Sequence, residues 1–471
     1  MRQNLARHFG ADAVFLIEAL AGPPGHRPHG LLALGPLVTV SVAQGELTID
    51  GHPVLAGHLM RRALASGGVR ETPDGRLMVP EATKSQSGGL WSVLRHMGSG
   101  FAVTGDLGPG FGFGFLGYFG YDAIRHVEAL PYCISKGPGA PEVCFSIYQT
   151  VIRADAEGTV VITAGIGGVA DGNAAALAEI LARVPDDIVP AVPRPRRIED
   201  STTEDRYLTS VETALEHIRA GDIYQVQIGH ELTIDGDAAP EAVYARLRRR
   251  NPAPYMVLGQ AGGVTLAGAS PEVFVRVTGD QVLMRPLAGT IPRRHDPLAD
   301  EAAARKLAGD PKEIAEHIML VDLCRNDIGR FCAAGSLEVP VLLATEAYSH
   351  VHHLVSTVTA TIEAGADIWD IVAATFPAGT MTGAPKVRAM EIIEALETRR
   401  RGLYAGAFGW IDFASGDADL ALCIRTAIHD GRNWSVRASA GIVADSDPAR
   451  EWRETRAKMA AGYWAITGEE L

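Results

Sequence analysis

The chain has 471 residues, of which 47% are hydrophobic and 21% are charged, as in a soluble globular protein with ample core. Its formal net charge of −13 argues against nucleic acid or an anionic membrane surface as the main partner, so an anionic small molecule would need a metal ion or a few placed cations to bind. The five cysteines show no CxxC spacing and predict reduced, mostly buried thiols, not a disulfide framework or a zinc site.

The first residues do not resemble a targeting or membrane segment. Asp12 and Glu18 interrupt the apolar stretch that a signal peptide would need. No run in the chain approaches the length that crosses a membrane. The sequence therefore predicts a cytoplasmic protein with no membrane partner.

Residues 1–190 form the first predicted region, in which strand-like and helix-like segments follow one another. The predicted strands cover 31–51, 145–155 and 159–166, and the predicted helices cover 88–97 and 172–183. A crossover rich in proline and charge, 185–205, leads to a second region over 200–471.

The segment from Gly112 to Gly117 matches GxGxxG, the pattern of dinucleotide-binding loops. It is rich in aromatic residues, does not open a helix, and lacks the strand–helix–strand frame and the distal acid that such a loop needs. We interpret it as a glycine-aromatic strand and turn packed under a sheet.

The second region mixes helices and strands in the same way. A helix is predicted over 202–220 and strands over 223–232 and 263–278. Strands meet at short turns such as 277–280, which favours antiparallel or mixed pairing. The predicted fold class is α+β, mixed α/β, with two mostly antiparallel or mixed sheets flanked by helices.

Two predicted helices each carry a Glu-x-x-Glu pair directly after an Asp-Pro start. The pairs are Glu313 with Glu316 and Glu451 with Glu454. Residues three apart lie on one helix face, so each pair presents two carboxylates in one direction. If the helices face each other, the four side chains form a hard-cation site that suits Mg2+ better than zinc or copper.

Structural alternatives explain the same residues. Asp310 is placed to cap its helix, with Glu313 as the acid of a capping box. Glu454 and Lys458 have the spacing of an ion pair one helical turn apart. Two solvated acidic faces would show the same pattern.

A loop of small residues, Gly379 to Pro385, precedes a long predicted helix that ends at Gly402. Such a loop can aim backbone N–H groups and the hydroxyls of Thr380 and Thr382 at a carboxylate or a phosphate. The Walker A pattern is absent, and a plain helix entry explains the segment equally well.

Eight segments occur together in the order found in chorismate-utilising enzymes. They read GDIYQVQIGHEL, GASPEVFVRV, RPLAGTIPR, DPKEIAEHIMLVDLCRNDIGR, YSHVHHLVSTV, FPAGTMTGAPKVRAMEII, LYAGAFGW and GIVADSDPAREWRET. The chain resembles the large subunit of anthranilate synthase and that of its sister, aminodeoxychorismate synthase, strongly over 202–471 and more loosely before. The resemblance implies the anthranilate synthase large-subunit fold, with a regulatory-type N-terminal region like an amino-acid site and a chorismate-binding catalytic region.

The resemblance implies a metal site made by the two glutamate pairs. Glu316 and Glu454 would hold Mg2+, and Glu313 and Glu451 would assist through water. The metal would bind the ring carboxylate of chorismate and so supply positive charge to an acidic protein.

The resemblance also implies substrate-binding and catalytic residues. The substrate contacts would be Ala288, Gly289, Thr290, Tyr404, Arg425, Ser439, Ala440, Gly441 and Lys458. Glu272 would be the general acid that protonates the departing C4 hydroxyl, which requires a raised pKa. Thr380 would line the ring pocket, and His353 would move a proton as pyruvate leaves. Taken alone, His350, His352 and His353 fit ordinary half-buried histidines.

Gln225 separates amination from hydration. Isochorismate and salicylate synthases resemble this segment but carry a lysine there to activate water. A neutral amide cannot deprotonate water, whereas ammonia is nucleophilic when neutral. The sequence therefore predicts an aminating enzyme.

The position of amination is less sharply indicated. Ala288 and the segment 251–256 resemble anthranilate synthases, whereas Tyr224 and the segments 351–357 and 382–386 resemble aminodeoxychorismate synthase. The favoured interpretation is Mg2+-dependent formation of anthranilate and pyruvate, an activity of tryptophan biosynthesis. The alternatives are 4-amino-4-deoxychorismate synthase and a 2-amino-2-deoxyisochorismate synthase that does not eliminate pyruvate. An inactive regulatory or scaffold paralogue is the alternative of a different class.

Two positions depart from the family pattern. Ser439 stands where the family has glycine, so a side chain intrudes where backbone approaches the substrate and is expected to alter carboxylate binding or slow pyruvate elimination. Ala19 replaces the serine of an element that helps to bind inhibitory tryptophan, and this predicts weak or absent tryptophan feedback.

No cysteine lies in a nucleophile-elbow context, so no fused glutaminase is predicted. Ammonia is expected from a separate glutamine amidotransferase subunit. The sequence leaves a homo- or hetero-oligomeric assembly open.

Overall fold

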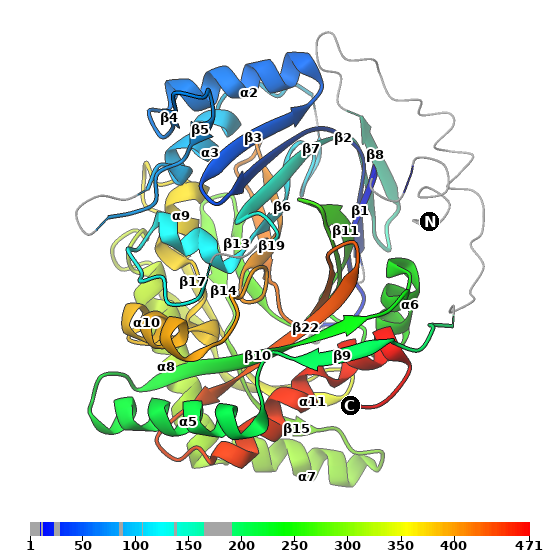
Figure 1. Cartoon of the computed structure of the whole chain (residues 1–471), viewed down its shortest axis with the longest axis vertical. Helices are drawn as coiled ribbons and strands as arrows, with labels where there is room; N and C mark the ends of the chain where they lie inside the picture. The colour runs from blue at the N-terminus through cyan, green and yellow to red at the C-terminus, as the bar shows by residue number, and fades with distance from the viewer. Residues whose placement is uncertain are drawn as a thin grey trace.

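The computed structural model describes residue 10 and residues 13–22, 29–83, 88–105, 107–135, 139–163 and 191–471. The helix predicted over 172–183 lies outside the described residues, as does the end of the strand predicted over 159–166. The remaining predicted elements are present, and the mixed α+β class is confirmed (Figure 1).

The helices lie mostly on the outside of the molecule. They are α2 (Pro53–Ala65), α3 (Leu90–Gly98), α5 (Glu204–Arg219), α6 (Pro240–Arg250), α7 (Pro297–Ala308), α8 (Pro311–Ile328), α9 (Ile368–Thr375), α10 (Lys386–Leu396) and α11 (Pro448–Thr467), with short 3-10 turns η2 (Tyr121–His126) and η3 (Gly379–Met381). Within the part of the chain that the structure describes, no helix is both long and apolar enough to cross a membrane.

The strands supply the interior. They are β1 (Val14–Ala19), β2 (His29–Ala43), β3 (Glu46–Gly51), β4 (Arg70–Glu71), β5 (Leu77–Met78), β6 (Gly114–Phe119), β7 (Val143–Ala154), β8 (Thr159–Thr163), β9 (Arg197–Asp200), β10 (Gln225–Asp235), β11 (Tyr255–Ala261), β12 (Val264–Ser270), β13 (Val273–Thr278), β14 (Gln281–Met284), β15 (Leu287–Pro292), β16 (Glu338–Ala347), β17 (Val351–Thr361), β18 (Gly383–Ala384), β19 (Ala407–Asp412), β20 (Ala418–Leu422), β21 (Thr426–His429) and β22 (Asn433–Ile442).

The strand pairings of the described residues are antiparallel, as expected. They join the described strands into one 22-stranded hydrogen-bonded network, where two separate sheets were expected. Long strands make this continuity possible. The 15-residue β2 pairs with β1, β3 and β7, and its register with β7 shifts between Pro36 and Val38, which lets the strand bend.

Strands from the two predicted regions pair with each other. β1 lies beside β11, and β6 lies beside β19 (Figure 1). The boundary near residues 190–200 stays a prediction, since part of that crossover lies outside the described residues.

The GxGxxG segment forms a buried strand, as interpreted from the sequence. All six residues of β6 are buried. A Cβ at Gly117 would lie 2.0 Å from the carbonyl oxygen of Cys144, and one at Gly114 would lie 2.1 Å from that of Ile411. The glycines therefore permit close backbone contact with neighbouring strands.

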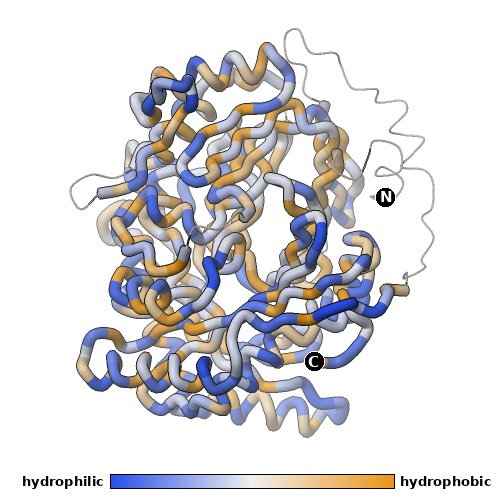
Figure 2. Tube along the Cα trace, viewed as in Figure 1, coloured by the Kyte–Doolittle hydropathy of each residue, from blue (hydrophilic) through white to orange (hydrophobic). Residues whose placement is uncertain are grey.

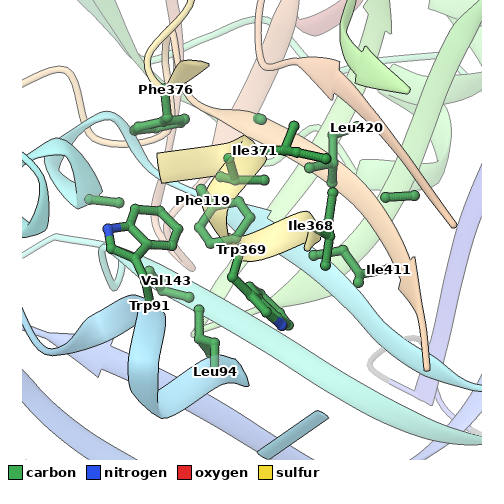
Figure 3. Packing of buried hydrophobic residues seen from close by; sticks show 14 of the residues in the cluster. Trp91, Leu94, Phe119, Val143, Ile368, Trp369, Ile371, Phe376, Ile411 and Leu420 are labelled. Carbon is green, nitrogen blue, oxygen red and sulfur yellow. The ribbon is translucent and has the colours of Figure 1, made fainter. Parts of the chain in front are cut away.

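The largest core surrounds α9, which leads into the loop before α10. In Figure 3, Trp369 of α9 lies between Leu94 of α3 and Phe119 of β6, and Ile368 lies beside Ile411 and Leu420. Figure 2 shows hydrophobic residues concentrated along these central strands and hydrophilic residues recurring along the outer helices. Burial of such large side chains anchors the following loop, because each contributes about 1.5–3 kcal/mol.

Helix α10 is shorter than predicted. It ends at Leu396, and not near Gly402, because Glu397 takes an extended conformation with φ −74° and ψ 152°. This conformation turns the Glu397 side chain toward Arg401 and Arg437.

Candidate active site

One face of the β10–β22 ladder forms the floor of the site. Gln225 and Gln227 are two residues apart on β10, so their side chains share this face. Val226 and Ile228 point to the opposite face and pack in a core with Ala440. The methyl group of Ala440, expected near the substrate, therefore lies behind the sheet.

Glycines leave room above this floor. Gln227 pairs with Gly441 in the ladder, and Gly229 pairs with Ser439. A Cβ at Gly441 would lie 2.8 Å from Gln225 Nε2, 3.0 Å from Gln227 Nε2 and 3.4 Å from Glu316 Oε1. Polar groups from β10 and α8 thus converge over a backbone without a side chain.

Helix α8 brings Glu316 to this point. Gln225 Nε2 donates a hydrogen bond to Glu316 Oε1 at 3.0 Å. Burial, together with the negative charges of Glu313 and Glu454, raises the pKa of Glu316 to about 7. Both predicted metal ligands, Glu316 and Glu454, therefore influence each other across two helices.

Helix α11 presents Glu454 from the other side. Its Oε1 lies 2.8 Å from Lys458 Nζ, so the predicted ion pair is present. Burial acts to raise the pKa of Glu454, but Lys458 and other cations outweigh it, and the pKa is lowered. The neighbouring Glu451 is buried and bonds with Ser446, and its pKa is raised by burial and by Glu454.

The predicted helix cap at the start of α8 is confirmed, whereas the capping-box role of Glu313 stays a prediction. The Asp310 side chain caps the helix by accepting hydrogen bonds from the backbone N–H groups of Lys312 and Glu313. Glu313 Oε2 lies 3.1 Å from where a Cβ of Gly289 would be, beside strand β15. Glu313 thus stands at the helix start and at the site edge.

The carboxylates suit a hard cation in donor type and charge. Glu316 and Glu454 offer oxygen ligands, and the raised pKa of Glu316 marks negative charge that protein cations do not balance. In this arrangement, no three carboxylate, imidazole or thiol groups among the described residues lie close enough to hold one ion together. Ligation by both glutamates would require side-chain movement.

Glu272 lies at a break between β12 and β13. The sequence predicted one strand stretch over 263–278, but Pro271 interrupts it. Thr380 Oγ1 donates to Glu272 Oε1 at 3.2 Å. Burial raises the pKa of Glu272 to about 8, so the carboxyl group is mostly protonated at neutral pH.

His350, His352 and His353 differ in their exposure and hydrogen-bond partners. His350 is exposed, and His352 Nε2 lies 2.9 Å from Asp300. His353 Nδ1 lies 3.0 Å from the carbonyl oxygen of Gly289 and 3.1 Å from Thr290 Oγ1. Burial lowers the pKa of His353 to about 4, so its ring is neutral at pH 7.

The loop before α10 is held at both ends. Lys386 Nζ pairs with Asp327 at 2.7 Å and donates to the carbonyl oxygen of Thr375 at 2.9 Å. Thr382 is fully buried, and its hydroxyl donates to the carbonyl oxygen of Ala378. Of the two threonine hydroxyls, only that of Thr380 therefore bonds Glu272.

A buried ionic brace supports the same loop, and sequence reasoning missed it. Glu397 binds Arg401 at 2.8 Å and Arg437 at 2.6 Å, and it accepts from the Gly229 N–H at 2.9 Å. Arg401 donates to the carbonyl oxygens of Met381 and Gln227. The brace ties the loop to β10.

The cationic side of the site is formed by α11 and the segment after β20. Lys458 Nζ donates to the carbonyl oxygen of Ser439 at 2.9 Å, and Arg425 Nη1 donates to that of Lys458 at 2.5 Å. Tyr404 Oη lies 2.7 Å from Ser439 Oγ. The predicted carboxylate-binding residues therefore come together.

Leu16 to Ala19 lie in β1, away from this site. Ile17 and Ala19 border a separate cavity of about 30 Å³ together with Tyr255, Trp410 and Asp419. Glu18 accepts hydrogen bonds from the Tyr244 hydroxyl and from Arg248. Weak or absent tryptophan feedback stays a prediction.

Comparison with known proteins places this geometry in a family. A family model described as chorismate binding enzyme matches residues 76–462. The chain belongs to the chorismate binding enzyme family. A 2-amino-4-deoxychorismate synthase from Streptomyces globisporus is 48% identical over 475 residues, which cover 99% of this chain and 94% of that protein. Anthranilate synthase component 1 from Streptomyces coelicolor is 40% identical, over 89% of this chain and 85% of that protein.

Solved structures of this family share the fold. Anthranilate synthase component I from Streptococcus pneumoniae superposes with a TM-score of 0.75 at 30% identity, over 93% of this chain and 92% of that one. The menaquinone-specific isochorismate synthase from Escherichia coli, at 17% identity and a TM-score of 0.67, shares the fold over 96% of this chain and 88% of that one. The chain is thus an enzyme of the anthranilate synthase and aminodeoxychorismate synthase class.

Proposed function

We propose that this enzyme aminates chorismate at C2, expels the C4 hydroxyl, and retains the enolpyruvyl ether, giving 2-amino-4-deoxychorismate. The observation that carries the proposal is the 48% identity, over 99% of this chain, to the Streptomyces globisporus 2-amino-4-deoxychorismate synthase. The sequence alone favoured anthranilate and pyruvate. The similarity to that relative favours the alternative given above as 2-amino-2-deoxyisochorismate synthase, since 2-amino-2-deoxyisochorismate and 2-amino-4-deoxychorismate are the same compound.

The reaction balances as chorismate plus ammonia giving the amino product plus water. A C2–N bond forms as ammonia gives up a proton, the two ring double bonds shift from C1=C2 and C5=C6 to C1=C6 and C4=C5, and the C4–O bond breaks. Glu272 gives its proton to the departing hydroxyl, and its raised pKa, about 8, supports that role at neutral pH. The Thr380 hydroxyl orients the Glu272 carboxyl through their hydrogen bond.

Gln225 fits a binding role at the aminated edge of the ring. Its amide is neutral and donates to Glu316, so it positions groups without deprotonating water. We expect ammonia to come from a separate glutamine amidotransferase subunit, since among the described cysteines only Cys133 is exposed and none marks a glutaminase.

Glu316 and Glu454 would hold Mg2+, with Glu313 and Glu451 assisting through water. The ion would supply positive charge for the ring carboxylate of chorismate. Arg425, Lys458 and Tyr404 would bind the second carboxylate from the opposite side.

Incubation of the purified chain with chorismate, Mg2+ and ammonium tests the reaction. We expect a product that has gained nitrogen, lost water and kept the three enolpyruvyl carbons, as measured by mass spectrometry. A coupled lactate dehydrogenase assay should detect no pyruvate. Proton NMR distinguishes the C2 amine from the C4 isomer.

Three other outcomes would overturn the proposal. Fluorescent anthranilate with equimolar pyruvate would indicate an anthranilate synthase, which the neutral His353 also permits. A C4 amine would indicate 4-amino-4-deoxychorismate synthase. No turnover with either ammonium or an amidotransferase and glutamine would favour an inactive paralogue.

A further inference from the structure

Gln227 shares the floor of the site with Gln225 but has no role yet. It is half-buried, and its Nε2 lies 3.0 Å from where a Cβ of Gly441 would be, on the same side as Gln225 Nε2 and Glu316 Oε1. Its side chain therefore borders the space that the substrate enters.

A hydrogen-bond chain orients the Gln227 amide. Ser439 Oγ donates to Gln227 Oε1 at 2.8 Å. A hydroxyl has one proton, so Tyr404, whose Oη lies 2.7 Å from Ser439 Oγ, must donate to Ser439. The chain runs from Tyr404 through Ser439 to Gln227 and fixes the amide oxygen on Ser439 Oγ.

This orientation leaves donors facing the substrate. Among the described residues, none accepts a hydrogen bond from Gln227 Nε2. The backbone of Gln227 is fixed as well, because its N–H donates to Thr382 at 2.8 Å and its carbonyl oxygen accepts from Arg401 at 2.9 Å. The free N–H groups are thus preorganised, which reduces the entropy lost on binding.

Charge indicates which part of the substrate lies here. Chorismate carries a ring carboxylate and an enolpyruvyl carboxylate. The Glu316 side of the site carries the carboxylates of Glu313 and Glu316. On the Ser439 side, Lys458 Nζ bonds the Ser439 carbonyl oxygen at 2.9 Å and pairs with Glu454 at 2.8 Å. Arg425, bonded to the Lys458 carbonyl oxygen, pairs with no described carboxylate. An anionic group without a metal is therefore favoured on the Ser439 side.

We propose that Gln227 binds a carboxylate oxygen of the enolpyruvyl side chain of the substrate through Nε2, and that Ser439 is a positioning residue that orients this amide. The inference rests on the proposed function and deepens it. A product that retains the enolpyruvyl group can keep the same hydrogen bond to Gln227.

A double-mutant cycle tests the inference. Gln227→Leu should raise the KM for chorismate about tenfold or more, because a hydrogen bond to a charged group is lost. Ser439→Ala should raise it several-fold in the wild-type background, but not further in the Gln227→Leu background. Gln281→Leu, the same change on exposed β14, should leave the KM unchanged.

Binding without ammonia provides the second measurement. Titration calorimetry with chorismate and Mg2+ should show the same losses of affinity. Gln227→Glu, a variant of nearly the same shape, should weaken binding more than Gln227→Leu because its charge repels the carboxylate. An unchanged KM in Gln227→Leu, or fully additive effects of the two substitutions, would overturn the inference.

Pyruvate release separates this inference from the proposed function. If the wild-type enzyme retains the enolpyruvyl group, Gln227→Leu with Ser439→Gly should increase pyruvate per turnover. If the wild type itself releases pyruvate, the proposed function fails, but the cycle still decides whether Gln227 binds the substrate.

Discussion

Glu272 and Glu397 are both buried glutamates beside the loop that carries Thr380, with exposed fractions of 7% and 5%. Glu272 meets the loop through the Thr380 hydroxyl, and Glu397 meets it through Arg401. Their surroundings differ in one respect, because two arginines form ion pairs with Glu397, whereas Glu272 forms none among the described residues and feels only the more distant charge of Lys458.

This difference suits Glu272 to a role as proton donor and Glu397 to a structural role. Burial raises the pKa of Glu272 to about 8. Burial acts in the same direction on Glu397, but Arg401 and Arg437 outweigh it and lower its pKa. A buried carboxyl group can thus serve as a proton donor or as a structural anion, and arginines from other elements decide which.

The largest expected effect comes from removing the proton of Glu272. Glu272→Gln should lower kcat about 10²- to 10⁴-fold, the usual contribution of a general acid. The same variant should unfold at a higher temperature than the wild type at pH 7. A glutamate that must stay protonated up to about pH 8 makes the folded state less stable as pH rises above its ordinary pKa of 4.5, by roughly 3 kcal/mol at pH 7.

Both readouts are needed for this first prediction. Initial rates measure the proton donor, and thermal unfolding at pH 5 and pH 7 measures the linkage. Two results would contradict this prediction: a wild-type kcat in the variant, or a difference in stability between variant and wild type that does not grow from pH 5 to pH 7. Either result would assign Glu272 a structural role, like that of Glu397.

Glu397→Gln should produce the opposite pattern. Removing the carboxylate leaves Arg401 and Arg437 as buried charges without their partner, which should destabilise the fold by roughly 3–5 kcal/mol. Denaturant unfolding measures this loss. Glu391→Gln, which breaks a half-exposed pair with Arg388, should cost less than about 1 kcal/mol and serves as the control.

Motifs predicted the catalytic half of this comparison but not the supporting half. Glu272, Thr380 and Glu316 were expected in the site, because each occurs in a segment whose order resembles the family. Glu397 lay inside the predicted helix, which was expected to run to Gly402, and carried no such signal. Its partners Arg437 and Gly229 lie 40 and 168 residues away, so only tertiary packing brings them together.

Gln227 shows the same limit within a strand. The alternation of β10 indicates that it shares a face with Gln225, and this signal was available from the sequence. Its partner Ser439 is 212 residues away, and the register between β10 and β22 that aligns them depends on long-range pairing. Local patterns predicted the elements well, but not the far end of α10 or the break at Pro271.

The pKa of Glu316 is raised, like that of Glu272, but a bound Mg2+ should lower it, as the arginines lower the pKa of Glu397. The Glu316 pKa of about 7 reflects burial and neighbouring carboxylates, which outweigh the opposing charges of Lys458 and Lys312. Saturating Mg2+, at about 100 times its dissociation constant, should stabilise the fold by about 2.7 kcal/mol. Thermal unfolding with and without Mg2+ measures the shift.

Glu316→Gln should abolish this Mg2+-dependent stabilisation, and Glu313→Gln should retain most of it, because Glu313 stands partly as a helix-start residue beside Asp310. Equal loss in both variants would indicate that Glu313 also binds the ion directly. No shift in the wild type would contradict the metal site.

The smallest effect, and the most specific, is the pH profile of Glu272. Its carboxyl group is protonated below its pKa of about 8, so kcat/KM for chorismate at fixed free ammonia should be flat up to that pH and fall tenfold per unit above it. Thr380→Val removes a hydrogen bond that lowers this pKa, so the falling limb should move to higher pH. A limb that stays in place in the Thr380→Val variant would assign the titration to another group, and would move the proton donor away from the buried carboxyl that lacks an arginine.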